Sequence, residues 1–292
     1  MVKEDMLTAR AHAAQWQARP LISWCSTPEG KQKAGNRMPL KPLKWYKQLA
    51  TKRGRLAAGA FLVEGPRAIS HLVQHHPDTI LEIVSVEDPP PAWHNYPQHY
   101  VTASQLQAIC STQTPQGMLA VVRLPAAVYT DDLPASMGSK VVLLEDVQDP
   151  GNVGTLIRTA AAFDFSGVIL TAKGADPLAL KCVQATAGTI LSVWLRRTSQ
   201  YLELVQALRR QGYVCVAADV GGTALPTVLA APPRLLLVLG NEAAGLSPAL
   251  LQVADVRLKI PLSAKAESLN VAACGAICMY LSTAGGSGGV GE

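Results

Sequence analysis

The second half of the chain alternates short apolar runs with segments of helical period. Runs rich in Val, Ile and Leu predict buried strands at 141–144, 168–170, 214–218, 235–239 and 256–260. Apolar residues at helical spacing predict helices from about residue 154 and over 178–187, 201–211, 248–254 and 269–283. Strands that alternate with helices favour an α/β domain with a parallel sheet, which we place at residues 140–284.

The segment 40–125 has a mixed pattern that predicts a second, smaller α/β domain. We expect helices over 43–55 and 67–75, and strands at 61–64, near 80–86 and near 119–122. Residues 126–139 mix Pro, Ala, Ser and Gly without a period, and we interpret them as a linker. Residues 1–39 are polar and basic, and 285–292 are rich in glycine. We expect a disordered extension and a flexible tail there.

The first apolar run of the larger domain ends in a polar loop that is typical of a ligand site. After 141–144 the chain reads EDVQDPGNVG, and the helix that follows carries Arg158. Open α/β sheets bind their ligands at the carboxyl ends of the strands. If the helix starts near Gly154, Thr155 and Arg158 share one face, one turn apart. Taken alone, Asn152 and Arg158 fit an N-cap and a solvated arginine just as well.

Two later strands end in the same way. The run 235–239 leads into GNEAAGLS, a polar loop with two glycines. The run 256–260 is closed by Pro261, which has no N–H for a β-ladder, and the sequence ESLN then opens a helix of small residues. Three polar loops at one edge of a parallel sheet predict a single site.

Together these stretches resemble the three signature motifs of the SpoU (TrmH-type) RNA ribose methyltransferases. The sequences DPGNVG with Arg158, LGNE with GLS, and IP with ESLN have the family's order and spacing, over roughly 140–284. A weaker likeness over 41–124 is carried by Lys52-Arg53 and by FLVEG at 61–65. That segment is similar to the family's RNA-binding N-terminal domain.

The resemblance implies transfer of a methyl group from S-adenosylmethionine to a ribose 2′-hydroxyl of tRNA or rRNA. It also implies a C-terminal trefoil knot that holds the cofactor, and a homodimer whose active site draws on both chains. The implied catalytic residues are Arg158, Asn152, Glu242, Ser268 and Asn270. The implied cofactor-binding residues are Leu239, Gly240, Asn241, Ile260, Leu262, Ser268 and Leu269. The implied RNA-binding residues are Lys52, Arg53, Glu64 and Arg67.

The family's proposed role for Arg158 is that of a base at the 2′-hydroxyl. A guanidinium with a pKa above about 12 is a poor proton acceptor at neutral pH. Binding of the 3′-side phosphate and stabilisation of the developing alkoxide are physically easier roles.

The chain departs from the family's usual residues at three positions. Similar members have glycine at the positions of Ala243 and Ala264, and arginine at that of Gln184. Alanine cannot take a positive φ cheaply. The departures at Ala243 and Ala264 keep open an alternative, a catalytically silent RNA-binding or assembly protein of the same fold.

Charge and composition agree with an RNA-directed protein without proving it. The first 60 residues hold 12 Lys and Arg against 3 Asp and Glu. This basic arm fits a contact with a phosphate backbone or a solvated tail. Trp45 and Tyr46 fit nucleobase stacking or, more commonly, the hydrophobic side of the first helix.

Other classes are disfavoured. All six histidines precede residue 100, which argues against a metal site or histidine catalysis in the larger domain. The six cysteines form no CxxC pair, and we find neither an apolar run of about 18 residues nor a signal-peptide core. We expect a cytoplasmic protein that binds no membrane, and Met38 is a second candidate for the start of translation.

Overall fold

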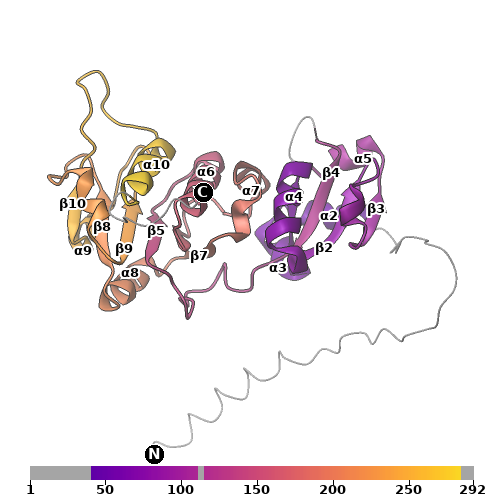
Figure 1. Cartoon of the computed structure of the whole chain (residues 1–292), viewed down its shortest axis with the longest axis horizontal. Coiled ribbons are helices and arrows are strands. Elements are labelled where there is room, and N and C mark those ends of the chain that lie inside the picture. The colour runs from indigo at the N-terminus through magenta and orange to yellow at the C-terminus, as the bar shows by residue number, and fades with distance from the viewer. Residues whose placement is uncertain (1–40, 111–114, 284–292) are drawn as a thin grey trace, which may run out of the picture. The chain divides into compact units, whose positions relative to one another are not determined.

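The computed structural model describes residues 41–110 and 115–283 of the 292-residue chain (Figure 1). The expectations for 1–39 and 285–292 lie outside the described residues. The described part contains two separate sheets, one before and one after the segment 126–139. None of the helices in this part of the chain has the length and apolar character needed to cross a membrane.

The first sheet has four strands in the order β1-β4-β2-β3, with only the β2–β3 pair parallel. Its strands are β1 (Ala60–Glu64), β2 (Ile80–Ser85), β3 (Gln98–Tyr100) and β4 (Met118–Arg123). Its helices are α2 (Leu43–Gln48), α3 (Lys52–Ala58), α4 (Pro66–His75) and α5 (Ala103–Gln107), with the 3₁₀ turns η2 (Pro77–Thr79) and η3 (Pro91–Trp93). The prediction of a small N-terminal α/β domain agrees with these elements.

The prediction of a single helix over 43–55 was wrong, because the chain forms two helices there, α2 and α3. Thr51 is the N-cap of α3, and its side chain accepts a hydrogen bond from the backbone N–H of Gly54. Tyr46 is fully buried, which confirms the hydrophobic-side interpretation for this residue. Trp45 is half-buried and packs against the same hydrophobic cluster, and the Lys41 ammonium lies 4.1 Å from the centre of its ring.

The second sheet has six strands, all parallel, in the order β10-β8-β9-β5-β6-β7. Its strands are β5 (Lys140–Leu144), β6 (Gly167–Thr171), β7 (Trp194–Thr198), β8 (Val214–Ala218), β9 (Leu235–Leu239) and β10 (Val256–Leu258). The predicted parallel α/β sheet is confirmed. The strand order reverses between β5 and β9, which is where such sheets bind their ligands.

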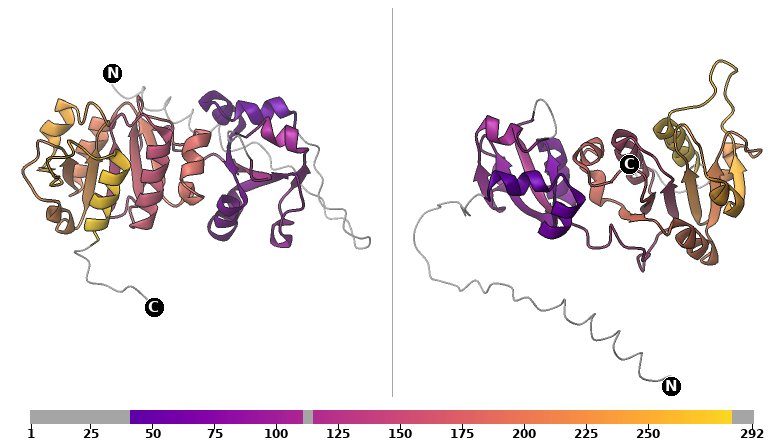
Figure 2. Two further views of the ribbon diagram at one scale, coloured as in Figure 1. Left: turned by 90° about the horizontal axis from the view of Figure 1, so that it is seen from above. Right: turned by 180° about the vertical axis from the view of Figure 1, so that it is seen from behind.

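Helices cover both faces of this sheet (Figures 1 and 2). On one face, α6 (Pro150–Ala162), α7 (Leu180–Ala185) and α10 (Val271–Leu281) pack with alternate strand residues such as Val142 and Leu237. On the other face, α8 (Tyr201–Arg210) and α9 (Pro248–Val253) pack with Val141 and Leu236. Two 3₁₀ helices, η4 (Thr189–Leu191) and η5 (Pro226–Ala230), complete the domain.

Two boundaries differ from those expected. Helix α6 starts at Pro150 rather than near Gly154, because the Asp149 carboxylate accepts the N–H of Asn152 and caps the helix four residues earlier. Strand β10 ends at Leu258 rather than at residue 260. The backbone N–H of Lys259 bonds to the carbonyl of Ala224 and leaves the ladder with β8.

Strand β7 was not expected, and it anchors the segment 126–139. The backbone N–H of Arg197 donates to Val128 O at 2.7 Å, and the Trp194 indole N–H donates to Met137 O at 3.3 Å. The Thr198 hydroxyl also donates to the Asp131 carboxylate. The segment has no helix or strand of its own, but these bonds fix it along the edge strand.

Candidate active site

The loop after β5 is shaped by Asp149. Its carboxylate accepts the backbone N–H of Asn152 at 2.9 Å and, more weakly, the Lys181 ammonium at 3.3 Å. The bond from Asn152 is the main reason why the pKa of Asp149 is lowered. The cap fixes the direction of α6, so that Asn152 in its first turn faces the other two motif loops.

Asn152 joins all three motif loops. Its side-chain amide donates to Glu242 Oε1 at 2.8 Å, and its carbonyl oxygen accepts from the Asn270 amide at 3.2 Å. These partners are 90 and 118 residues away along the chain. The prediction that three distant loops meet at one edge of the sheet is therefore fulfilled in the geometry.

A cavity of about 750 Å³ lies beside this junction, at the carboxyl ends of β8, β9 and β10. All the residues predicted to bind the cofactor line it: Leu239, Gly240, Asn241, Ile260, Leu262, Ser268 and Leu269. Glu242 lines it as well, whereas Asn152 and Asn270 stand at its margin through the contacts above. Apolar residues make up most of the lining, and charged side chains line it at Asp219, Glu242, Lys259 and Glu267.

Sequence reasoning missed the side of the cavity that follows β8. Ala218, Asp219 and Val220 line it there, and Cys274 lines it from α10. A signal existed, because β8 also runs into a glycine-bearing polar loop, Asp219 to Gly222. No motif marks that loop in the sequence.

The side chain of Asn241 shapes its own loop rather than facing a ligand. Its carbonyl oxygen accepts the N–H groups of Ala243 and Ala244, both at 2.9 Å, and its amide donates to Asp146 O at 2.9 Å. A Cβ on Gly240 would come within 2.5 Å of the Gly245 backbone, so only glycine fits this turn. The Asn241 side chain thus supports the cavity wall, and its backbone is the part left to contact a cofactor.

Glu145 is buried beneath that loop, with 4% of its surface exposed. Its carboxylate accepts the backbone N–H of Ser247 at 2.7 Å and the hydroxyl of Tyr201 at 3.1 Å. Burial, followed by the nearby Glu145 charge, raises the pKa of Tyr201. Glu145 was expected among the polar groups at the sheet edge, and the structure turns it inward as a support of the cavity wall.

Arg158 is not brought to the cavity within one chain. It is exposed on α6, about 9 Å along the helix axis from Asn152 at 1.5 Å per residue, and it is not among the lining residues. Thr155 is exposed beside it, as its place on the same helix face predicts, while Leu156, Ile157 and Ala160 are buried. The helix face was predicted correctly, but Arg158 does not line its own chain's cavity.

The outer side of α10 is apolar and exposed. Tyr280 is 60% exposed and Ile277 38%. The Tyr280 ring packs edge-on against Phe163 at the end of α6, with 5.9 Å between ring centres. Arg158 and this apolar surface therefore lie on helices that pack against each other.

The residues predicted to bind RNA fall in the first domain. Lys52 and Arg53 are exposed in the first turn of α3, and Arg67 is exposed at the start of α4. The Lys52 ammonium lies 4.4 Å from the ring centre of Tyr129. Glu64 ends β1 and is half-buried. Burial of the Cys110 thiol is the main reason why its pKa is raised, and the charge and hydrogen bond of Glu64 raise it further. The three cations are available to a phosphate backbone, while Glu64 is part of the domain's own structure.

The residues that depart from the family's usual ones are accommodated without strain. Among the described residues other than glycine, positive φ angles occur at Asp146, Asp164 and Ala187. Ala243 and Ala264 are therefore not held in the left-handed region. Gln184 is exposed on α7. The structure removes the backbone argument for a silent protein.

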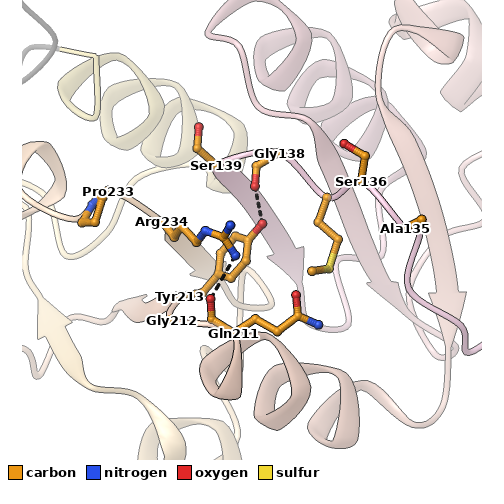
Figure 3. A pocket seen from close by; sticks show the side chains of 10 residues that line it. Ala135, Ser136, Gly138, Ser139, Gln211, Gly212, Tyr213, Pro233 and Arg234 are labelled. Carbon is orange, nitrogen blue, oxygen red and sulfur yellow. Dashed lines mark hydrogen bonds between the residues drawn. The ribbon is translucent and has the colours of Figure 1, made fainter.

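A second cavity, of about 660 Å³, lies at the opposite edge of the sheet, at the amino ends of β5, β8 and β9 (Figure 3). The Tyr213 hydroxyl donates to Gly138 O, and Arg234 Nη1 donates to Gln211 O at 3.0 Å. The Tyr213 and Arg234 side chains are thus engaged with backbone. It holds none of the residues predicted for the site.

Two family models match this chain. A family model described as the SpoU rRNA Methylase family matches residues 139–280. Another, described as the MRM3-like substrate binding domain, matches residues 41–120. The two matches fall on the two sheets of the structure.

Relatives are similar over most of the chain. The 23S rRNA (guanosine(2553)-2′-O)-methyltransferase RlmP of Bacillus subtilis is 30% identical over 82% of this chain and 94% of its own length. The crystal structure of the SpoU methyltransferase AviRb from Streptomyces viridochromogenes, in complex with the cofactor AdoMet, has a TM-score of 0.71 and 27% identity over 82% of this chain and 96% of that one. An AdoMet-bound rRNA methyltransferase from Sinorhizobium meliloti has a TM-score of 0.70 and 27% identity, over 82% and 93%.

Proposed function

Because the chain belongs to the SpoU family of RNA methylases, we propose that it transfers a methyl group from S-adenosylmethionine to a ribose 2′-hydroxyl of 23S rRNA in the cytoplasm. The observation that carries this proposal is the meeting of three motif loops at one cavity, through Asn152, Glu242 and Asn270. The RlmP relative, matched over nearly its whole length, favours 23S rRNA over tRNA.

The cavity fits the cofactor in size and chemistry. Its volume of about 750 Å³ lies in the range of small-molecule sites. Leu239, Ile260 and Leu269 offer apolar contact for an adenosyl group, and the backbone of the Gly240 loop offers polar groups. When bound there, S-adenosylmethionine supplies an electrophilic methyl group on a sulfonium.

The protein's task is then alignment and charge stabilisation. The Asn152–Glu242–Asn270 junction stands at the cavity margin and can hold a ribose by hydrogen bonds. Ser268 lines the cavity and can do the same. A cation near the ribose oxygen would stabilise the negative charge that develops as the proton leaves, and Arg158 is the candidate.

We propose that this arginine comes from a second copy of the chain. Arg158 lies outside its own chain's cavity, and the neighbouring surface of α10 is exposed and apolar at Ile277 and Tyr280. A homodimer formed through α6 and α10 would cover that surface. It would also bring the partner's Arg158 near the cavity.

Mixing two inactive variants tests the shared site. A dimer of one Arg158→Ala chain and one Glu242→Ala chain contains one intact cavity that faces an intact arginine, if the arginine acts across the interface. We expect each variant alone to be inactive and the mixture, after subunit exchange, to regain methylation. A mixture that stays inactive while forming mixed dimers would place Arg158 in the site of its own chain.

The activity itself is tested with purified protein, labelled S-adenosylmethionine and 23S rRNA that carries no modifications. We expect stoichiometric incorporation of one methyl group, at a ribose that then resists alkaline cleavage on its 3′ side. Calorimetry should show binding of S-adenosylmethionine by the protein alone. Methyl incorporation into a base, or no binding of the cofactor, would contradict the proposed function.

A further inference from the structure

Arg55 is a buried cation that the reaction described above does not use. Only 1% of its surface is exposed, although it stands on α3 beside the exposed Lys52 and Arg53. Its Nη1 donates to the backbone carbonyls of Leu49 and Ala50, both at 3.1 Å. A guanidinium cannot shed its charge, so burial at this depth requires an anionic partner.

That partner comes from the methyltransferase domain. Arg55 Nη2 donates to Asp176 Oδ2 at 2.6 Å and to the Tyr129 hydroxyl at 3.1 Å. Tyr129 belongs to the segment between the domains, and its hydroxyl also donates to Asp176, at 3.0 and 3.1 Å. Burial raises the pKa of Tyr129 to about 12, so the phenol keeps its proton. Three parts of the chain thus meet in one closed cluster: Arg55, Tyr129 and Asp176.

The Asp176 loop is joined to the loop that carries Asn152. The backbone N–H of Ala175 donates to Val147 O at 2.9 Å, within the first motif loop. Helix α7 follows Asp176 and packs against α6 so closely that a Cβ on Gly154 would lie 2.3 Å from Cys182 O. A displacement of Asp176 would therefore shift the loop that carries Asn152, beside the site of methyl transfer.

Apolar packing next to the cluster makes the connection stiff. Gly188, at the end of the α7 segment, lies against Ala68 and His71 of α4, with no room for a side chain. Residues of β1 and α4 belong to the same hydrophobic cluster as residues of α6 and α7. The ion pair thus stands at the margin of a continuous core, where its geometry is fixed by neighbours on both sides.

The cluster also reaches the candidate RNA surface. Lys52 lies over the ring of Tyr129 at 4.4 Å, and Arg53 follows it in the first turn of α3. The same short helix therefore carries the cations for RNA on its exposed side and Arg55 on its buried side. RNA held on this helix has a fixed relation to Asp176, and through it to Asn152.

We propose that Arg55, Tyr129 and Asp176 position the substrate RNA for methyl transfer, by fixing the RNA-binding domain to the loop beside the catalytic junction. The inference rests on the proposed function and adds three positioning residues to it. None of the three lines the cofactor cavity, so they act on the RNA and not on S-adenosylmethionine. A misplacement of about 1 Å between reacting groups can cost on the order of 100-fold in rate.

Steady-state and binding measurements on full-length Asp176→Asn and Arg55→Met test this positioning. We expect kcat for 23S rRNA to fall at least 10-fold, with the Kd for RNA changed less than about threefold and that for S-adenosylmethionine less than about twofold. Arg209→Met is the matched control, because it breaks an Arg–Asp pair with Asp255 inside one domain. A kcat that stays at the wild-type value in the folded variants, or that falls equally in the control, would overturn the proposal.

Hydrogen exchange provides a test that needs no turnover and so separates this proposal from the proposed function. In Tyr129→Phe and Arg55→Met we expect faster amide exchange at 172–178 and at 145–149, far along the chain from residue 55. Tyr129→Phe keeps both charges and serves if Arg55→Met does not fold. Faster exchange confined to 41–58 and 126–132 would show that the cluster stabilises only its own surroundings, and would refute the positioning role.

Discussion

Single residues of the site divide into those that face the cavity and those that shape it. The motifs of the family resemblance lead to several residues that line the cavity, because each motif lies at a strand end and parallel strands end at one edge of the sheet, but they omit the lining after β8. They could not separate the second kind. The Asn241 side chain forms its hydrogen bonds with its own loop and with Asp146 O, 95 residues earlier in the chain. Glu145 turns inward to bonds with Ser247 and Tyr201 that no local pattern shows.

Arg158→Ala should abolish methylation and leave the affinity for S-adenosylmethionine within about twofold of the wild type. The guanidinium lies outside the cavity of its own chain, so its loss removes charge stabilisation in the transition state and no cofactor contact. Turnover and calorimetry together check this. Arg210→Ala, an exposed arginine on α8, is the control and should stay fully active. Retained turnover in Arg158→Ala would remove the arginine from the mechanism.

Glu145→Gln should weaken the binding of S-adenosylmethionine by about 10-fold. The Glu145 carboxylate accepts hydrogen bonds from the Ser247 N–H and the Tyr201 hydroxyl, which support the cavity wall. In Glu145→Gln, a neutral amide oxygen forms a weaker bond to the Ser247 N–H than the carboxylate does, or the amide NH₂ faces that N–H and forms no bond. Tyr201→Phe removes one donor and keeps the charge, so its affinity should fall less. Equal affinities in wild type and Glu145→Gln, measured by calorimetry, would show that the wall does not depend on Glu145.

At the scale of elements, the strands and helices with strong periodicity were predicted, and those held by non-local bonds were not. Strand β7 reads WLRRT, with two arginines, and looks polar; Arg196 is nevertheless buried, because its guanidinium donates to the carbonyls of Leu195 and Asp132. Helix α5 did carry a local signal. Thr102 and Gln105 form a capping box, which sequence reasoning overlooked.

Gly154→Ala should destabilise the protein by about 1–3 kcal/mol. A methyl group there would lie 2.3 Å from Cys182 O and 2.6 Å from the Ala185 Cβ, so α6 and α7 would have to separate. Thr155→Ala, at the next and exposed position, should change stability by less than about 0.5 kcal/mol. Urea unfolding of both variants measures the difference, and equal midpoints would mean that the two helices can move apart freely.

For the whole molecule, the sequence indicated two α/β domains and their order, but not how they are joined. In the sequence, Arg55 is one of several cations in the basic first 60 residues. Nothing there indicates its partner, because Asp176 lies 121 residues away and belongs to no motif. Segment 126–139 read as a linker because it has no period, yet Val128 and Met137 accept hydrogen bonds from β7. The trefoil knot and the homodimer stay predictions of the family resemblance.

Tyr280→Glu should convert a dimer into monomers and abolish methylation, while S-adenosylmethionine still binds. A charge on this exposed apolar surface would have to be desolvated in the interface, and the partner's Arg158 would be lost from each site. Leu225→Glu, which charges an exposed leucine outside α10, is the control. Light scattering gives the mass, and a wild-type protein that is monomeric yet active would contradict the shared site.

Nucleotide-resolution mapping of ribose methylation in cellular RNA tests the central claim most directly. The RNA is taken from cells that lack the gene, and from the same cells carrying the wild-type chain or Arg158→Ala. We predict that one 2′-O-methyl nucleotide of 23S rRNA disappears with the gene, returns with the wild type and stays absent with the variant. Unchanged ribose methylation in all three, with or without a change in base methylation, would contradict the account.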